Sequence, residues 1–235
     1  MDPQVNNKPQ INIKKSVLFI DMSYYVFYRF FAISNWYRIQ EKLQKCEHRQ
    51  NKQDKQNNQD NQDNQDNQDN QDNNNIINNQ IPELDIENIL ENKFFMDKFH
   101  KIFIKKIHEI IQKYKIFNTQ AESQVIFGCD CPREQIWRMQ LFTEYKSCRF
   151  ENKTKFNKDI FIYVYKYIVP ELIQMGFYVL QSNYVEADDI IAVLSKTIIK
   201  KRMNCLDDLP PLYIITNDND YLQLLYYNNI NIYNL

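Results

Sequence analysis

Acidic residues recur directly after short apolar runs of the sequence. Asp21 follows the run 16–20, and Asp130 follows the run 124–127 and Gly128. An apolar run of this length that stops abruptly predicts a short buried strand. Acidic residues after two later runs complete the set, which comprises Asp21, Asp130, Glu186, Asp188, Asp189, Asp218 and Asp220.

These carboxylates are expected to gather at one edge of a sheet. Strands that alternate with helices predict a mostly parallel sheet covered on both faces, and ligands of such sheets bind beyond the carboxyl ends of the strands. Carboxylates gathered in a poorly solvated site repel one another, and divalent cations relieve that repulsion. Oxygen ligands favour Mg²⁺ or Mn²⁺ over zinc. Two such ions about 4 Å apart form the arrangement that hydrolyses phosphodiesters.

Each acidic group taken alone has a simpler interpretation. Asp21 is placed to cap the helix that follows it. Glu186 and Asp188 could complement a helix dipole, and Asp218 and Asp220 could form an ordinary turn. The coincidence of four such segments at one sheet edge favours the metal site.

The elements that must position these residues follow from the periodicity of the apolar residues. The expected strands are 16–20, 124–127, 177–180, 212–215 and 230–233, and the expected helices are 23–45, about 20 residues around 99–114, 161–172, 186–200 and 220–225. Pro170 is expected to kink or restart the third helix, and Gly176 to cap its carboxyl end.

Two segments are expected to lie outside this framework. Residues 1–15 form a polar tail without the apolar block of a signal peptide. Residues from about 46 to 82 are rich in Asn, Gln and Asp, and five Asn-Gln-Asp triplets run from Asn58 to Asp72. Such a composition buries too little apolar surface to offset the entropy of ordering, so we expect a disordered insertion. Residues 16–235 otherwise read as one domain.

The composition excludes several classes of site and location. The two glycines, Gly128 and Gly176, exclude a G-x-G-x-x-G dinucleotide loop and a Walker A loop. The formal net charge of −1 neither demands nor excludes nucleic acid. Five scattered cysteines are expected to be reduced thiols of an intracellular protein that is not secreted. No apolar run reaches the roughly 18 residues of a membrane span, so no membrane partner is expected.

Five motifs in order resemble the 5′ nuclease superfamily. They are Val17-Leu-Phe-Ile-Asp21, Val125-Ile-Phe-Gly-Cys-Asp130, Glu144-Tyr-Lys-Ser-Cys-Arg149, Tyr184-Val-Glu-Ala-Asp-Asp189, and Thr216-Asn-Asp-Asn-Asp-Tyr-Leu-Gln-Leu-Leu225. This superfamily includes the flap endonucleases, the phage 5′ exonucleases and the 5′-nuclease domain of bacterial DNA polymerase I. The resemblance spans roughly 16–34 and 92–235, and Tyr184 to Asp189 is its most specific part.

The resemblance implies an α/β, PIN-like fold with a mostly parallel sheet of about five strands and a short helical arch. It assigns the seven carboxylates as ligands or near-ligands of two Mg²⁺ ions, for which Mn²⁺ is expected to substitute. It also implies that Lys146 and Arg149 contact the scissile phosphate, which suits an ammonium point charge and a bidentate guanidinium. Without the resemblance, these two residues could belong to a solvated basic helix face.

Further contacts with nucleic acid are expected from residues that follow Asp21 and from residues that follow Asp130. Phe27 lies where the family carries an aromatic residue that stacks on a frayed base, and Tyr28 and Arg29 adjoin it. The sequence alone also allows Phe27 to be a core residue. Arg133 and Arg138 are expected to add phosphate contacts.

The sequence departs from the family pattern in several places: the arch between Arg149 and Ile160 is short, and the Asn-Gln-Asp tract interrupts the family's first helical connection. Met22 follows the first Asp where family members usually carry Gly. The family normally continues into a helix–three-turn–helix module that grips duplex DNA, and we expect this module to be missing. We therefore expect weak duplex binding unless a protein partner supplies this module.

The favoured function is Mg²⁺-dependent hydrolysis of nucleic-acid phosphodiesters by a two-metal mechanism, as a 5′-3′ exonuclease or flap endonuclease. The expected partner is DNA with a free 5′ end or flap, and the family implies a role in DNA replication and repair. One alternative is an inactive or truncated nuclease-like module that binds nucleic acid. Another is a Mg²⁺-dependent phosphatase of small phosphate esters.

Overall fold

The protein is built on one five-stranded sheet whose strands are all parallel. A computed structural model describes residues 11–59, 83–113, 124–145, 156–205 and 210–235. The strands are β1 Val17–Asp21, β2 Val125–Cys129, β3 Tyr178–Gln181, β4 Leu212–Ile215 and β5 Ile230–Tyr233. Their order in the sheet is β3-β2-β1-β4-β5, and every neighbouring pair is parallel. The predicted α/β, PIN-like fold class is thereby confirmed.

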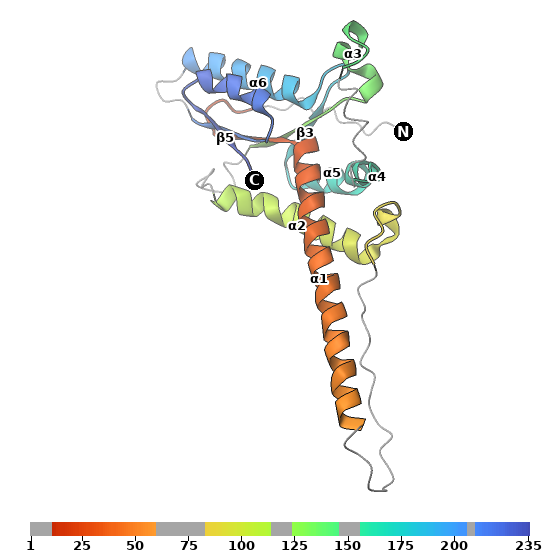
Figure 1. Ribbon diagram of the computed structural model, residues 1–235. Coiled ribbons are helices and arrows are strands. Elements are labelled where there is room, and N and C mark those ends of the chain that lie inside the picture. Colours follow the sequence, from red (N-terminus) through yellow and green to blue (C-terminus); the bar gives the residue numbers. More distant parts are fainter. Residues whose placement is uncertain (1–10, 60–82, 114–123, 146–155, 206–209) are drawn as a thin grey trace.

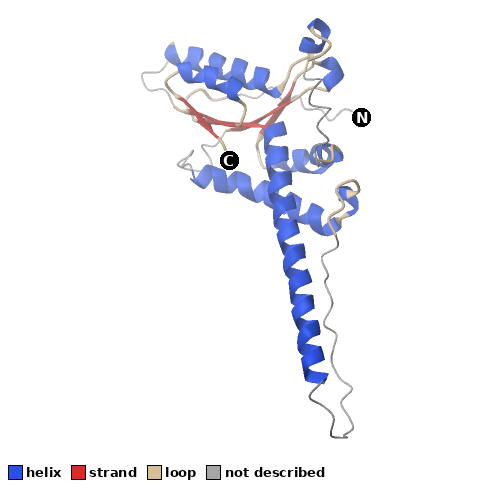
Figure 2. Cartoon of the chain, in the orientation of Figure 1, coloured by secondary structure: helices blue, strands red, loops and turns tan. Residues whose placement is uncertain are grey.

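Helices cover both faces of this sheet, as Figures 1 and 2 show. One face carries α6 (Ala187–Met203) and the 3₁₀ helix η6 (Asn219–Tyr226). The other face carries α1 (Met22–Gln59), α2 (Lys93–Lys113), α4 (Asp159–Tyr163), the π-helical turn η5 (Val164–Ile168) and α5 (Val169–Gln174). Shorter helical segments are η1 (Ile89–Glu91), η3 (Arg133–Gln135) and α3 (Trp137–Leu141).

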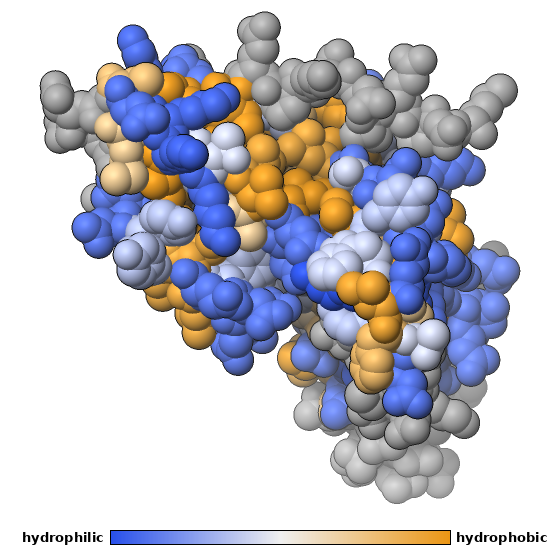
Figure 3. Space-filling view, turned by 90° about the horizontal axis from the view of Figure 1, so that it is seen from above, coloured by the Kyte–Doolittle hydropathy of each residue, from blue (hydrophilic) through white to orange (hydrophobic). Residues whose placement is uncertain are grey.

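Alternation along β1 explains why both faces must be covered. Val17 and Phe19 pack into the core beneath α6 and η6, whereas Leu18 and Ile20 pack into the core against α1 and α2. A strand buried on both sides reads as a continuous apolar run, as this one does. The view in Figure 3, from above, shows hydrophilic residues bordering an apolar area of the surface.

Within the described residues, no helix combines the length and the apolar character that crossing a membrane requires.

Helix α1 is longer than the sequence predicts. It continues to Gln59, beyond the residue near 46 at which we expected the disordered insertion to begin, and it projects away from the sheet (Figure 1). Residues 46–59 contain neither Gly nor Pro, so no residue there breaks the helix. Residues 60–82 and the start of the polar tail, 1–10, lie outside the described residues.

The third predicted helix is interrupted where Pro170 lies. A π-helical turn, η5, separates α4 from α5, and Pro170 occupies the first turn of α5. Gly176 ends α5 with a positive φ of 84°. The Gly176 N–H donates to the Ile173 carbonyl, and the Phe177 N–H donates to the Leu172 carbonyl. These are the two hydrogen bonds of a Schellman motif, so the predicted capping role of Gly176 is confirmed.

Gly128 allows α6 to lie close to the sheet, and Gly128→Ala is expected to destabilise the protein. A Cβ atom there would lie 2.9 Å from the Ile191 Cγ1 and 3.2 Å from the Ala187 carbonyl oxygen. Overpacking of this kind costs about 1–3 kcal/mol. Urea unfolding of the two proteins measures the difference, and a stability equal to that of the wild type would contradict the close approach of α6.

Candidate active site

A cavity of about 590 Å³ opens at the carboxyl ends of the strands. Six of the seven carboxylates singled out in the sequence line it, and they come from four separate segments. The lining residues are Asp21, Ser23, Tyr24, Phe27, Asp130, Glu186, Asp188, Asn217, Asp218, Asn219 and Asp220. The seventh acid, Asp189, does not line this cavity.

Asp21 lies where β1 ends and α1 begins, and its side chain is 9 % exposed. Its Oδ1 accepts a hydrogen bond from the Tyr24 N–H (3.0 Å), and its Oδ2 accepts one from the Tyr221 hydroxyl (3.2 Å). Burial, reinforced by the charges of Asp130 and Asp188, raises the pKa of Asp21 to about 6. Asp21 therefore caps α1 and at the same time adds a poorly solvated carboxylate to the cavity.

Asp130 joins the first turns of two helices. Its Oδ2 accepts a hydrogen bond from the Ser23 hydroxyl at 2.6 Å, and its Oδ1 accepts one from the Ala187 N–H at 2.8 Å. Since Ser23 belongs to α1 and Ala187 begins α6, this one carboxylate links the two helix N-termini. Both termini favour negative charge nearby.

The N-terminus of α6 carries the densest group of acids. Glu186 is its N-cap, and the side chains of Glu186 and Asp189 form a capping box with each other's backbone N–H groups. Burial, with the charges of Asp189 and Glu186, raises the pKa of Asp188. Asp188 thus lines the cavity without a basic residue within ion-pair distance among the described residues.

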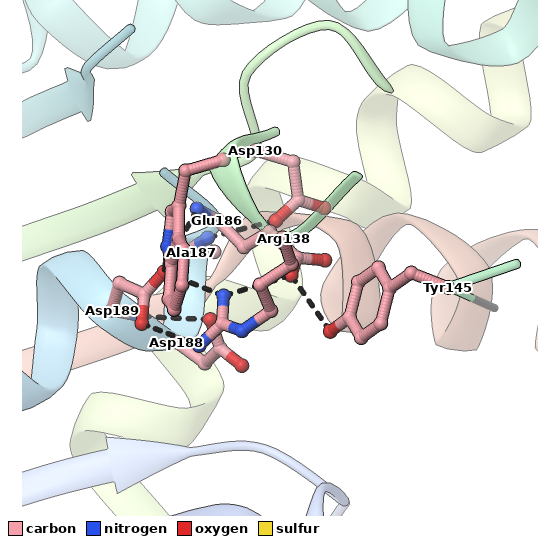
Figure 4. Close-up of polar contacts among 8 residues, drawn as sticks. Asp130, Arg138, Tyr145, Glu186, Ala187, Asp188 and Asp189 are labelled. Atoms are coloured by element: carbon pink, nitrogen blue, oxygen red, sulfur yellow. Dashed lines mark hydrogen bonds and ion pairs between the residues drawn. The ribbon is translucent and has the colours of Figure 1, made fainter. Parts of the chain in front are cut away.

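Arg138 of α3 accounts for the different position of Asp189. Its guanidinium donates two hydrogen bonds of 2.7 Å to the Asp189 carboxylate and one of 3.0 Å to the Glu186 Oε2 (Figure 4). The Tyr145 hydroxyl also donates to the Glu186 Oε2, at 2.9 Å. Asp189 is therefore paired with a cation of the protein itself.

Asp218 and Asp220 follow β4, which neighbours β1 on the side away from β2. The Asp218 Oδ1 accepts the Asp220 N–H at 2.9 Å and so caps η6. The Asp218 N–H in turn donates to the Thr216 hydroxyl at 3.1 Å. Asp218 and Asp220 therefore form a turn, and they also line the cavity. The short helix predicted at 220–225 is present as the 3₁₀ helix η6.

The donor set of the cavity suits a hard divalent cation. All six charged lining groups are carboxylates, and burial, with the charges of neighbouring acids, raises the pKa values of two of them, Asp21 and Asp188. Among the described residues, no three His, Cys, Asp or Glu side chains are close enough to form a ready metal cage. Cation binding would therefore require the carboxylates to move together, which relief of their repulsion favours.

The residues predicted to contact nucleic acid are not all placed at the cavity. Phe27 lines it, is 39 % exposed, and packs against Phe156 with ring centroids 4.3 Å apart. Tyr28, half-buried, stacks with the Arg29 guanidinium, whose Cζ lies 4.3 Å from the ring centre. Arg29 is itself 6 % exposed, so it is not available to a phosphate in this conformation.

The other predicted phosphate contacts lie elsewhere or outside the described residues. The Arg133 guanidinium donates to the Tyr145 carbonyl at 2.9 Å, and Arg138 is held by two carboxylates. Lys146, Arg149 and most of the helical arch predicted between Arg149 and Ile160 fall in 146–155, which is outside the described residues.

Sequence reasoning missed several residues of the cavity wall and its support. Ser23 and Tyr24 lie in the first helical turn after Asp21, so their position in the chain was a usable signal. Tyr145 and Tyr221 lie inside two of the quoted motifs, but their carboxylate partners are 41 and 200 residues away, so the motifs did not reveal these contacts.

Comparison with known proteins agrees with this geometry. The family model for the 5′-3′ exonuclease, N-terminal resolvase-like domain matches residues 92–235. That range contains β2 to β5 and six of the seven carboxylates. No curated protein matches the chain. The family supports a nuclease function with a nucleic-acid substrate, and the resemblance inferred from the motifs is confirmed. The chain belongs to the family of 5′-3′ exonuclease N-terminal, resolvase-like domains.

Proposed function

We propose that the protein is a Mg²⁺-dependent 5′ nuclease that hydrolyses phosphodiesters at the cavity beyond the strand ends. The single observation that carries this proposal is the convergence of six carboxylates from four segments on one cavity. The family supports the nuclease class, and the donor chemistry supports the metal dependence.

The cations would be held by carboxylates that line the cavity. The candidates are Asp21, Asp130, Glu186, Asp188, Asp218 and Asp220. Bound Mg²⁺ or Mn²⁺ would neutralise charge on the scissile phosphate and lower the pKa of an attacking water. Asp189 is a weaker candidate because its carboxylate is already paired with Arg138.

The charge of the cavity explains why a cation would be needed for substrate binding as well. A phosphodiester entering among six carboxylates is repelled, and the repulsion is strong where water is scarce. The exposed ring of Phe27 offers an uncharged contact at the same cavity, on which a base could stack. Lys146 and Arg149 would supply the positive charge for the phosphate next to it.

A preference for 5′ ends or flaps in DNA is also part of the proposal. It is tested with 5′-labelled single-stranded, flapped and duplex oligonucleotides of DNA and RNA, and with p-nitrophenyl phosphate. We expect Mg²⁺-dependent products from the single-stranded and flapped DNA, and no release of p-nitrophenol. Release of p-nitrophenol with intact oligonucleotides would instead identify a phosphatase.

A second candidate function is nucleic-acid binding without cleavage. It is favoured by one observation: Asp21, Glu186 and Asp218 already serve as helix caps, and no three acids in the described part of the chain form a ready cage. This candidate predicts binding of the same oligonucleotides in EDTA and no products with Mg²⁺ or Mn²⁺. The oligonucleotide panel therefore separates the two functions.

A further inference from the structure

The guanidinium of Arg138 lies between the two carboxylates that form the capping box of α6. It makes a bidentate pair with Asp189, with two hydrogen bonds of 2.7 Å, and its Nη1 also reaches the Glu186 Oε2 at 3.0 Å (Figure 4). Glu186 is 5 % exposed, so the pair with Glu186 is largely withdrawn from water. Bidentate pairs of this kind fix geometry as well as charge.

The surroundings of Arg138 show that its guanidinium contacts other side chains of the protein. The Arg138 Cζ lies 4.8 Å from the centre of the Trp137 ring, and the Trp137 indole N–H donates to the Asp189 Oδ2 at 3.3 Å. The Asp189 carboxylate therefore accepts hydrogen bonds from two donors of the protein itself, the Arg138 guanidinium and the Trp137 indole. Asp189 is consequently paired with a cation of the protein.

Further contacts around Arg138 dock the segment 131–145 onto the N-terminus of α6 and the residues before it. The Trp137 N–H donates to the Tyr184 carbonyl at 2.8 Å, and the Cys131 N–H donates to the Val185 carbonyl at 3.2 Å. At the other end of the segment, the Tyr145 hydroxyl holds the Glu186 Oε2. The chain that continues from this segment carries Lys146 and Arg149.

We propose that Arg138 is a positioning residue: paired with Asp189, it fixes the Glu186 carboxylate at the cavity and docks the segment that leads to Lys146 and Arg149. Asp189 is then the partner of Arg138 and not a metal ligand, and Arg138 is not a phosphate contact. The kinetic part of this inference rests on the proposed nuclease function, whereas the docking part does not.

The test uses three single variants and one double variant of the full chain. Arg138→Lys keeps the positive charge but loses the planar fork, and Arg138→Gln loses both. Asp189→Asn removes the partner charge at nearly constant volume. Arg138→Gln with Asp189→Asn completes a double-mutant cycle. All are also made in a Trp36→Phe background, in which Trp137 is the remaining tryptophan of the chain.

The positioning role predicts a split between turnover and binding. Arg138→Lys and Arg138→Gln should both lower kcat about 10–100-fold, as the loss of a residue that orients a metal ligand does. KM should change less than about threefold. Asp189→Asn should have a similar effect, and the double variant should be no more than about threefold worse than either single variant. Oligonucleotide affinity in EDTA, and its dependence on salt, should match the wild type.

A second readout does not need activity. The Trp137 emission of the metal-free protein should shift in the Asp189→Asn and Arg138→Gln variants by the same amount as in the double variant. If the wild type cleaves no substrate, the proposed function fails, and this emission cycle still decides the docking. Additive shifts in the cycle would overturn the inference.

A phosphate contact would give the opposite pattern. Arg138→Lys would then keep the wild-type kcat, Arg138→Gln would weaken oligonucleotide binding about tenfold, and the salt slope would fall by about one. That result, or full activity of Arg138→Gln, would overturn the positioning role. Arg138→Lys and Asp189→Asn keep the test decisive if Arg138→Gln does not fold.

Discussion

Asp21→Asn is expected to stabilise the metal-free protein at pH 7 and to abolish cleavage. Asp21 is 9 % exposed, and burial raises its pKa from 3.8 to about 6. A shift of this size corresponds to about 3 kcal/mol of unfolding free energy at neutral pH. Asn keeps an oxygen that can accept the Tyr24 N–H but carries no charge. We expect the unfolding free energy to rise by about 1–3 kcal/mol. We expect cleavage to fall at least about 100-fold, which is more than the loss of a residue that only contacts a metal ligand typically causes.

The pH dependence of this gain has a defined sign. Because the pKa of Asp21 is raised in the folded protein, the folded state holds the proton more tightly than the unfolded state. The wild type therefore loses stability as the pH rises from about 4 to above 6, whereas the Asn variant has no such titration. Urea unfolding in EDTA should show a difference near zero at pH 4 that reaches its full value at pH 7.

Asp220→Asn is the matched control for stability. Asp220 lines the same cavity but its side chain is exposed, so its replacement should change the unfolding free energy by no more than about 0.5 kcal/mol. An Asp21→Asn protein that is less stable than the wild type at pH 7 would show that the two hydrogen bonds of Asp21 outweigh its burial.

Arg202→Met is expected to cause the largest loss of stability away from the cavity. Arg202 is 1 % exposed, and its guanidinium donates to the backbone carbonyls of Ile13 (2.7 Å), Lys15 and Pro210. These bonds join the end of α6 to the segments that precede β1 and β4. Met fills a similar volume but leaves three acceptors without this donor, each of which costs about 1–3 kcal/mol if it stays buried.

Part of this loss is offset, because burial of the charge is itself unfavourable and lowers the pKa of Arg202 to about 10. We therefore expect Arg202→Met to lose about 2–4 kcal/mol in urea unfolding. Lys201→Met, at the exposed neighbouring position, should stay within about 0.5 kcal/mol of the wild type. Equal stabilities of the two variants would show that the Arg202 contacts contribute nothing.

The sequence predicts the sheet and the helices on it because their signals are local. β4 and β5 lie at the predicted residues, since β4 is a short apolar run and β5 alternates apolar residues with Asn231. The gathering of acids also follows from topology, because parallel strands bring their carboxyl ends to one edge. Six carboxylates therefore meet at the cavity although they are spread over 200 residues of chain.

The partners of individual side chains could not be predicted in the same way. Arg138 carries the charge expected of a phosphate contact, and its pairing with Asp189 depends on a contact across 51 residues. The burial of Arg29 follows from packing against Tyr25 and Tyr28, which the sequence does not specify. Side-chain pairs of this kind are set by the tertiary structure, whereas strand ends are set by the chain itself.

The central claim is that the carboxylates of the cavity form a cation-dependent nuclease site. It is tested most directly by cleavage of a 5′-labelled flap oligonucleotide with Mg²⁺, with Mn²⁺ and with EDTA, by the wild type and by Asp188→Asn. Asp188 lines the cavity with no basic partner among the described residues, so Asn should remove its charge and leave the fold intact. We predict products from the wild type with either cation, none in EDTA, and none from Asp188→Asn. Equal cleavage by the two proteins, or cleavage that persists in EDTA, would contradict the claim.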